Sequence, residues 1–149
     1  MGKRRLSKSD IKRLNERIAP LGLELDKKET VDSDNEFYLV DGKPWLYEED
    51  GLLVPHLKLL LQKPGLLKTV TVDMGAVPFI VGGADVMRPG VTAIEGGISE
   101  DQLVAVIDER HGKPLAVGNA LLDSADMETA TSGKVVATRH WVGDKHWNA

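Results

Sequence analysis

The sequence predicts an α+β fold in which a small α/β part precedes a closed or nearly closed β-barrel. Three observations predict this class. Apolar residues recur at helical spacing near the N-terminus, an Asp-Gly pair at 41–42 separates two aromatic runs, and β-branched residues alternate with glycine-rich turns beyond residue 69. The 149 residues are 42% hydrophobic and 28% charged, which is the composition of a globular protein with a buried core.

The first predicted element is a helix over residues 9–19 that ends at Pro20. Ser7 and Asp10 form an S-x-x-D capping pattern ahead of apolar residues at helical spacing. Its opposite face is basic, and we interpret that face either as simply solvated or as a set of auxiliary phosphate contacts. The four candidates for phosphate contact are Lys8, Lys12, Arg13 and Arg17.

Residues 21–53 are predicted to form strands, because Leu21, Leu23 and Leu25 alternate and the Asp-Gly pair at 41–42 is typical of a hairpin. The acidic run at 48–51 is predicted to be a loop. Residues 53–62 predict a short apolar helix that starts at Pro55, with His56 on its surface. The Lys-Pro-Gly turn at 63–65 is the predicted boundary region, which divides the chain into 1–68 and 69–149.

The second part is predicted to contain five or six strands with short helical pieces, which favours a small barrel. Strands are expected at 70–72, 102–107, 115–122 and 135–142, a short turn or helix at 76–81, and a brief helical turn at 127–132, while residues 85–87 precede the turn at 88–91. Residues 88–91 place proline second and glycine third, which predicts a type II turn.

Several classes of chemistry are excluded by residue type or spacing. The chain has no cysteine, its four histidines lack zinc-site spacing, and neither a phosphate-loop, a dinucleotide-binding nor a G-x-S-x-G motif is present. We therefore predict a protein that is not an enzyme and that needs no cofactor or metal. No apolar run approaches the roughly 20 residues that span a bilayer, so we expect a soluble, cytoplasmic protein without a membrane partner.

The glycine-rich stretch GGADVMRPGV at 82–91 is the strongest candidate binding segment. Gly82 and Gly83 expose main chain, and unpaired N–H groups in a turn can hold an anion such as a phosphate. The alternative is that the glycines only close a tight corner of the barrel.

Two pairs of segments resemble known families. Residues 72–91, VDMGAVPFIVGGADVMRPGV, resemble the opening half of a PUA domain, an RNA-binding module, and 114–120 with 133–135 resemble its second half. Residues 54–64, VPHLKLLLQKP, and 140–147, HWVGDKHW, are similar to segments of the malignant-T-cell-amplified family of translation factors. The resemblance identifies an archaeal-type stand-alone member. It implies a pseudobarrel of about six strands at 69–149 after a pre-PUA α/β domain at 1–68.

The resemblance also implies RNA binding in translation, by association with transfer RNA or the small ribosomal subunit in initiation or recycling, together with a translation-factor protein partner. The residues that it implies for RNA binding are Gly75, Ala76, Gly82, Gly83, Ala84, Asp85, Arg88, Pro89, Gly90, Lys134, Val142, Gly143 and Asp144. Their basic residues are few, chiefly Arg88 and Lys134, with Lys145 nearby.

Two alternatives to direct RNA binding stay open. One is a protein-docking module of a ribosome-associated complex that uses the aromatic residues Phe37, Tyr38, Trp45 and Trp147. The other is a specificity subunit that acts in trans for an RNA-modifying enzyme.

Overall fold

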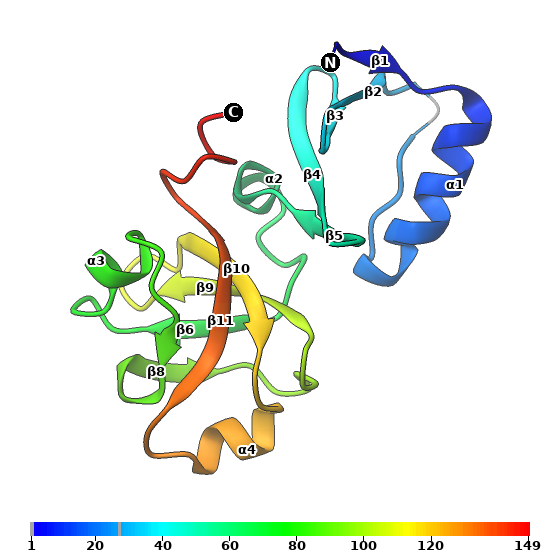
Figure 1. Cartoon of the computed structure of the whole chain (residues 1–149). Coiled ribbons are helices and arrows are strands. Elements are labelled where there is room, and N and C mark those ends of the chain that lie inside the picture. Colours follow the sequence, from blue (N-terminus) through cyan, green and yellow to red (C-terminus); the bar gives the residue numbers. More distant parts are fainter. Residues whose placement is uncertain (1, 27) are drawn as a thin grey trace.

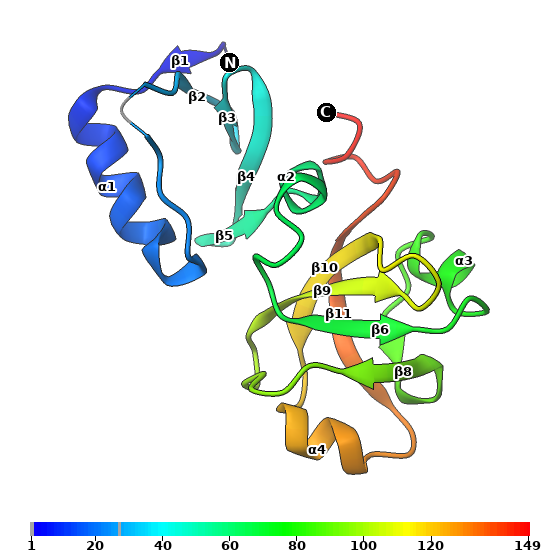
Figure 2. The ribbon, with the colours of Figure 1, turned by 180° about the vertical axis from the view of Figure 1, so that it is seen from behind.

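The computed structural model describes residues 2–26 and 28–149. The chain forms two sheets, a five-stranded sheet in the order β1-β2-β3-β4-β5 and a six-stranded sheet in the order β7-β11-β10-β9-β6-β8. Figures 1 and 2 show the two sheets side by side, with helix α2 (Leu57–Gln62) between them. The second sheet curls into a nearly closed barrel. The predicted α+β class is confirmed.

The first sheet is an antiparallel meander whose turns were predicted from sequence. Its strands are β1 (Arg4–Arg5), β2 (Val31–Asp34), β3 (Phe37–Val40), β4 (Lys43–Glu49) and β5 (Leu52–Pro55). Asp41 and Gly42 have φ of 50° and 82°, which is the geometry of a two-residue hairpin. Asp50 and Gly51 repeat this turn between β4 and β5. In the acidic run predicted as a loop, Glu48 and Glu49 therefore end strand β4, and Asp50 and Gly51 form the turn.

Helix α1 (Lys8–Ile18) forms where the capping pattern predicts it. The Ser7 hydroxyl accepts the Asp10 N–H group at 3.1 Å, and an Asp10 carboxylate oxygen accepts the Ser7 N–H group at 3.1 Å. That backbone hydrogen bond, with the Ser7 hydroxyl and the Arg4 guanidinium, lowers the pKa of Asp10 to about 2. A short 3₁₀ turn, η1 (Ala19–Leu21), follows.

Two sequence predictions in this half are wrong. Leu23 and Leu25 are buried but form no strand, because the Asn15 side chain accepts the Leu25 N–H group at 2.8 Å and takes the place of a strand partner. Residues 52–55 form β5 instead of the start of a helix, since pairing with β4 buries Leu53 and Val54. Helix α2 starts only after His56.

The second sheet combines one parallel strand pair with antiparallel pairs. Its strands are β6 (Thr69–Val72), β7 (Val86–Met87), β8 (Val91–Ile94), β9 (Leu103–Asp108), β10 (Pro114–Ala120) and β11 (Lys134–Trp141). Its helical pieces are α3 (Val77–Ile80), η2 (Arg88–Gly90) and α4 (Ser124–Thr129). Strands β6 and β9 run parallel, with Val72 opposite Asp108. The loops that follow these two strands therefore leave the same edge of the barrel.

The two sheets share a buried cluster. It joins Tyr47, Val54 and Leu57 of the first half to Leu103 and Val117 of the second. The division into 1–68 and 69–149 stays a prediction, and its boundary falls between α2 and β6. Within residues 2–26 and 28–149, no helix is long and apolar enough to cross a membrane.

Candidate nucleic-acid interface

The glycine turn after α3 does not offer the unpaired donors that the sequence predicts. The N–H groups of Gly82 and Ala84 donate to the carbonyl oxygen of Phe79 at 3.1 and 3.0 Å, and that of Gly83 donates to Ile80 at 3.0 Å. These bonds satisfy the last carbonyl groups of α3, as turns after helices commonly do. The expectation of an anion-holding nest at 82–84 is therefore wrong.

Internal packing explains the glycines instead. Gly83 has φ of +94°, and a Cβ atom there would lie 2.8 Å from the Trp141 ring. A Cβ atom on Gly90 would lie 3.2 Å from the Cβ atom of Ala76. Side chains are absent at both positions because neighbouring residues occupy the space. This arrangement matches the alternative in which glycine closes a tight corner.

Arg88 is held by backbone carbonyl groups. Its guanidinium donates to Met127 at 2.7 Å, to Val91 at 3.1 Å and to Glu128 at 3.5 Å. The predicted type II turn is also wrong, since residues 88–90 form the 3₁₀ turn η2 and Gly90 does not have a positive φ. The close approach of Ala76, rather than a left-handed backbone, favours glycine at this position.

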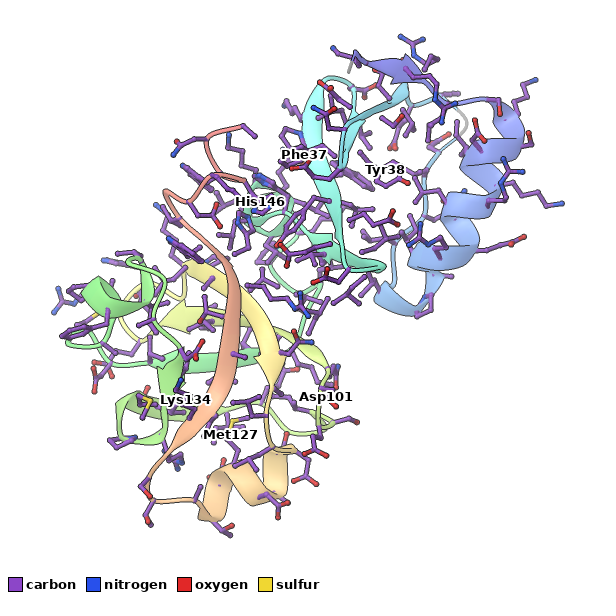
Figure 3. All side chains as sticks on the ribbon, viewed as in Figure 1. Phe37, Tyr38, Asp101, Met127, Lys134 and His146 are labelled. Carbon is purple, nitrogen blue, oxygen red and sulfur yellow. The ribbon has the colours of Figure 1, made fainter. Side chains whose placement is uncertain are left out.

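The next pair of predicted residues, Asp85 and Lys134, bind each other. The Lys134 ammonium lies 3.1 Å from the Asp85 carboxylate, and the Thr138 N–H group donates to Asp85 at 2.9 Å. Figure 3 shows Lys134 on β11, on the side of the barrel near Met127. The ammonium group is exposed, but its charge is balanced within the protein.

Two of the three predicted residues after β11, Val142 and Asp144, face inward. Asp144 is buried and accepts the N–H groups of Trp141 at 3.0 Å and Trp147 at 2.8 Å. Val142 packs against the cluster shared by the two sheets. Gly143 provides a turn with φ of +91°. These residues organise the C-terminal segment rather than the barrel surface.

The aromatic residues proposed for protein docking are not exposed. Trp45 is 8% exposed, and Phe37, Tyr38 and Trp147 are half-buried against the hydrophobic clusters. The prediction of an exposed aromatic docking surface is therefore wrong.

The basic helix and the PUA-like turn do not form one surface. Figures 1 and 2 place α1 and α3 at opposite ends of the molecule. Arg13 and Arg17 are held in ion pairs with Asp10 at 2.5 Å and Glu48 at 2.6 Å. The two lysines of the predicted set line a separate groove of about 1000 Å³ beside residues 22–25.

Sequence reasoning missed a basic loop between β9 and β10. The buried carboxylate of Asp108 accepts the N–H groups of Arg110 at 2.9 Å, His111 at 2.5 Å and Lys113 at 3.2 Å. The His111 N–H group contributes most, against the opposing effect of burial, and together the three lower the pKa of Asp108. The ionised carboxylate folds the loop back on itself, and all three basic side chains are exposed.

This loop lies beside the start of the PUA-like motif. The Glu109 N–H group donates to Val72 at 3.0 Å, and the Met74 N–H group donates to the Glu109 carboxylate at 3.3 Å. Both views show the yellow β9–β10 loop next to α3 (Figures 1 and 2). Phe79 on α3 is 69% exposed. We call residues 73–80, 88–90 and 109–113 together the strand-end surface.

Comparison with known proteins assigns the family. The sequence pattern of the PUA domain matches residues 68–142. This chain belongs to the PUA-domain family. A domain of unknown function, DUF1947, matches residues 3–63, in the place of the predicted pre-PUA domain.

Relatives of this PUA protein occur in archaea and eukaryotes. An uncharacterized protein of Methanocaldococcus jannaschii is 39% identical over 96% of this chain and 93% of its own length. Translation machinery-associated protein 20 of Saccharomyces cerevisiae is 29% identical over 76% of this chain, and malignant T-cell-amplified sequence 2 of Mus musculus is 31% identical over 76%. The match spans 66% and 65% of these two proteins. The resemblance to the malignant-T-cell-amplified family is confirmed.

Solved structures show the same architecture. The crystal structure of a PUA-domain protein of Aeropyrum pernix in a tartrate complex has a TM-score of 0.89 and 31% identity, over 98% of this chain and 89% of that chain. A structure of an H/ACA ribonucleoprotein bound to a substrate RNA has a TM-score of 0.52 and 25% identity, over 67% of this chain and 31% of that chain.

Charge on the PUA half is concentrated in few places. Residues 69–149, all of which the structure describes, hold six Lys and Arg residues against eleven Asp and Glu residues. Arg88 is bound by carbonyl groups, and Lys134 and Arg139 are held in ion pairs. In this range the remaining cations are Arg110, Lys113 and Lys145, and two of them lie on the strand-end surface.

A group of potential metal ligands lies at the junction of the two sheets. The ligand atoms of His140, Asp144 and His146 lie within 4.8 Å of one another. However, the Nε2 atom of His140 accepts the Leu57 N–H group at 3.1 Å, and its Nδ1–H donates to Asp144 at 2.8 Å. Both ring nitrogens are therefore used, and the geometry is that of a hydrogen-bonded network. His56, predicted on a helix surface, is buried in this network.

Proposed function

We propose that this PUA protein is an RNA-binding factor of translation, which contacts transfer RNA or small-subunit RNA during initiation or recycling. Its family, the translation-related names of its yeast and mouse relatives and the RNA complex among its structural neighbours support this proposal. The single observation that carries it is the position of the β9–β10 loop, which carries the exposed cations Arg110 and Lys113 and is hydrogen-bonded through Glu109 to the segment that leads into α3 and exposed Phe79.

The chemistry of the strand-end surface fits an RNA strand with unpaired bases. Guanidinium and ammonium groups bind phosphate oxygens, which fixes the path of the backbone. The exposed ring of Phe79 offers a face on which a base can stack, which is a common way to hold single-stranded RNA. Gly75, in the loop before α3, is exposed and has no side chain, although the Asp73 carboxylate lies 3.3 Å from where a Cβ atom would stand.

The small number of cations limits how strongly binding depends on salt. For two phosphate contacts with a single strand, the slope of log affinity against log salt is expected to be about −1.4. A much steeper slope would require more phosphate contacts than Arg110 and Lys113 supply. The salt slope therefore limits the number of phosphate contacts, and variants of each surface show which of them RNA binds.

Fluorescence anisotropy with transfer RNA and with a small-subunit RNA helix tests the proposal. We expect the double variant Arg110→Ala/Lys113→Ala to weaken binding about ten- to thirtyfold, because each exposed contact contributes roughly 0.7–1 kcal/mol. The matched control is Lys3→Ala/Lys43→Ala, which removes the same charge from exposed sites on the first half. Equal losses in the two double variants would contradict the proposed surface.

A further inference from the structure

The C-terminal segment 142–149 leaves the barrel and packs against the first half of the chain. The His146 ring stacks on Tyr47 with centroids 4.0 Å apart, and the Trp147 ring is nearly parallel to His56 at 6.4 Å. Figure 3 shows His146 near Phe37 of the first sheet, and their ring centroids are 5.8 Å apart. The end of the chain therefore spans the junction between the two sheets.

His56 makes two hydrogen bonds that require one neutral tautomer. Its Nδ1 atom accepts the Lys58 N–H group at 3.0 Å, so this nitrogen carries a lone pair. Its Nε2–H group then donates to the carbonyl oxygen of His146 at 2.9 Å. The same ring caps the start of α2 and holds the C-terminal segment.

His140 requires the opposite neutral tautomer. Its Nε2 atom accepts the Leu57 N–H group, while Nδ1–H donates to Asp144. Asp144 also accepts the Trp147 N–H group at 2.8 Å. Strand β11, the C-terminal segment and the N-terminus of α2 are thus joined through two imidazole rings whose centroids are 4.8 Å apart.

We infer that residues 144–149 form a clasp that fixes the orientation of the two sheets, and that protonation of His56 or His140 opens it. Each ring accepts a hydrogen bond from a backbone N–H group through the lone pair of one nitrogen. A proton on that nitrogen removes the hydrogen bond and leaves two donors facing each other, which is a repulsive contact. The clasp therefore holds only while both rings are neutral.

The surroundings of the two rings favour the neutral forms. Burial lowers the pKa of His56 to about 4, and burial also lowers the pKa of His140 although Asp144 opposes this effect. The titratable and charged groups that face the rings are Tyr47 and Glu49 on β4, Lys58 on α2, Arg139 on β11, and Asp144 and His146 on the C-terminal segment. Since the folded pKa of His56 lies below its ordinary value of 6.5, the clasp weakens as the pH falls from that value toward about 4.

Spin-label distances test the clasp, and the absence of native cysteine makes labelling at two sites direct. We choose exposed Lys43 on the first sheet and exposed Thr92 on the second, each replaced by cysteine. We expect one narrow distance distribution at neutral pH. It should broaden as the pH falls toward 4, while the far-ultraviolet circular dichroism of both sheets is retained.

Two sets of variants make the outcome decisive. His56→Asn keeps a donor and an acceptor but takes up no proton, so we expect the broadening to move to lower pH, whereas the exposed control His111→Asn leaves it unchanged. Removal of residues 144–149 should broaden the distribution at neutral pH, and Asp144→Ala in the full chain replaces this test if the truncated chain does not fold. A narrow distribution at neutral pH in the truncated chain or, where that does not fold, in Asp144→Ala would overturn the inference, as would equal effects of the two histidine variants.

Discussion

The Nε–H group of Arg88 donates a hydrogen bond to the backbone carbonyl oxygen of Met127 at 2.7 Å. The same guanidinium donates to Val91 at the start of β8. Through these two bonds, Arg88 of η2 is linked to both α4 and β8. The turn η2 connects β7 and β8, the two edge strands of the nearly closed barrel. The arginine of the PUA-like motif therefore stabilises the open side of the barrel.

Replacing Arg88 with alanine should lower the free energy of unfolding by about 2 kcal/mol, because carbonyl groups of Met127 and Val91 lose charged donors. Urea unfolding followed by circular dichroism measures this loss. Arg110→Ala, at an exposed position without an ion pair, is the control and should change stability little. A fully stable Arg88→Ala protein with weakened RNA binding would show that the guanidinium serves RNA instead.

Gly83→Ala should destabilise the protein by about 1–3 kcal/mol, because the new Cβ atom meets the Trp141 ring and the backbone is left-handed. Gly82→Ala is a matched control one residue earlier. There the nearest atoms are carbonyl oxygens at 3.4 Å and φ is not positive, so the cost should be small. Thermal unfolding compares the two, and equal melting temperatures would be incompatible with packing as the reason for glycine.

Acid should destabilise the fold through His56. The unfolded imidazole has its ordinary pKa near 6.5, whereas burial lowers the folded value to about 4, so the unfolded state binds more protons between these limits. The free energy of unfolding should fall by about 3 kcal/mol over this window. Urea titrations at a series of pH values measure the fall. His56→Asn should flatten the profile in that range, and an unchanged profile would refute this assignment.

Asp108→Ala should weaken RNA binding, although it removes a negative charge. The carboxylate orders the loop by accepting three N–H groups, so its loss leaves Arg110 and Lys113 on a disordered segment. Electrostatics alone predicts the opposite sign, namely tighter binding. Asp108→Asn keeps a carbonyl acceptor and should recover part of the affinity. Anisotropy with transfer RNA distinguishes the two cases, and tighter binding of Asp108→Ala would count against an ordering role.

The elements that were predicted correctly depend on residues that lie close together in the sequence. The capping box of Ser7 and Asp10 and the hairpin at Asp41 and Gly42 depend on residues a few positions apart, and both are confirmed. Leu25 fails as a strand residue because its partner is the Asn15 side chain, ten positions away. Alternating apolar residues indicate burial at this segment, but they do not indicate which group satisfies the backbone.

The proposed RNA-binding surface was harder to predict because it depends on contacts between distant residues. Whether the Gly83 N–H group is free depends on α3, and the reason for the glycine lies at Trp141. Arg110 and Lys113 come near the PUA motif only because β6 and β9 pair in parallel. Nothing in the motif itself indicates that residue 72 lies opposite residue 108.

The proposed surface is tested most directly by amide chemical-shift mapping of the full-length, nitrogen-15-labelled protein during titration with transfer RNA and a small-subunit RNA helix. The strand-end surface predicts that the largest perturbations fall at residues 73–79 and 109–113, while the amides of α1 stay unchanged. Perturbations confined to residues 8–18, or their absence from residues 109–113, would contradict it.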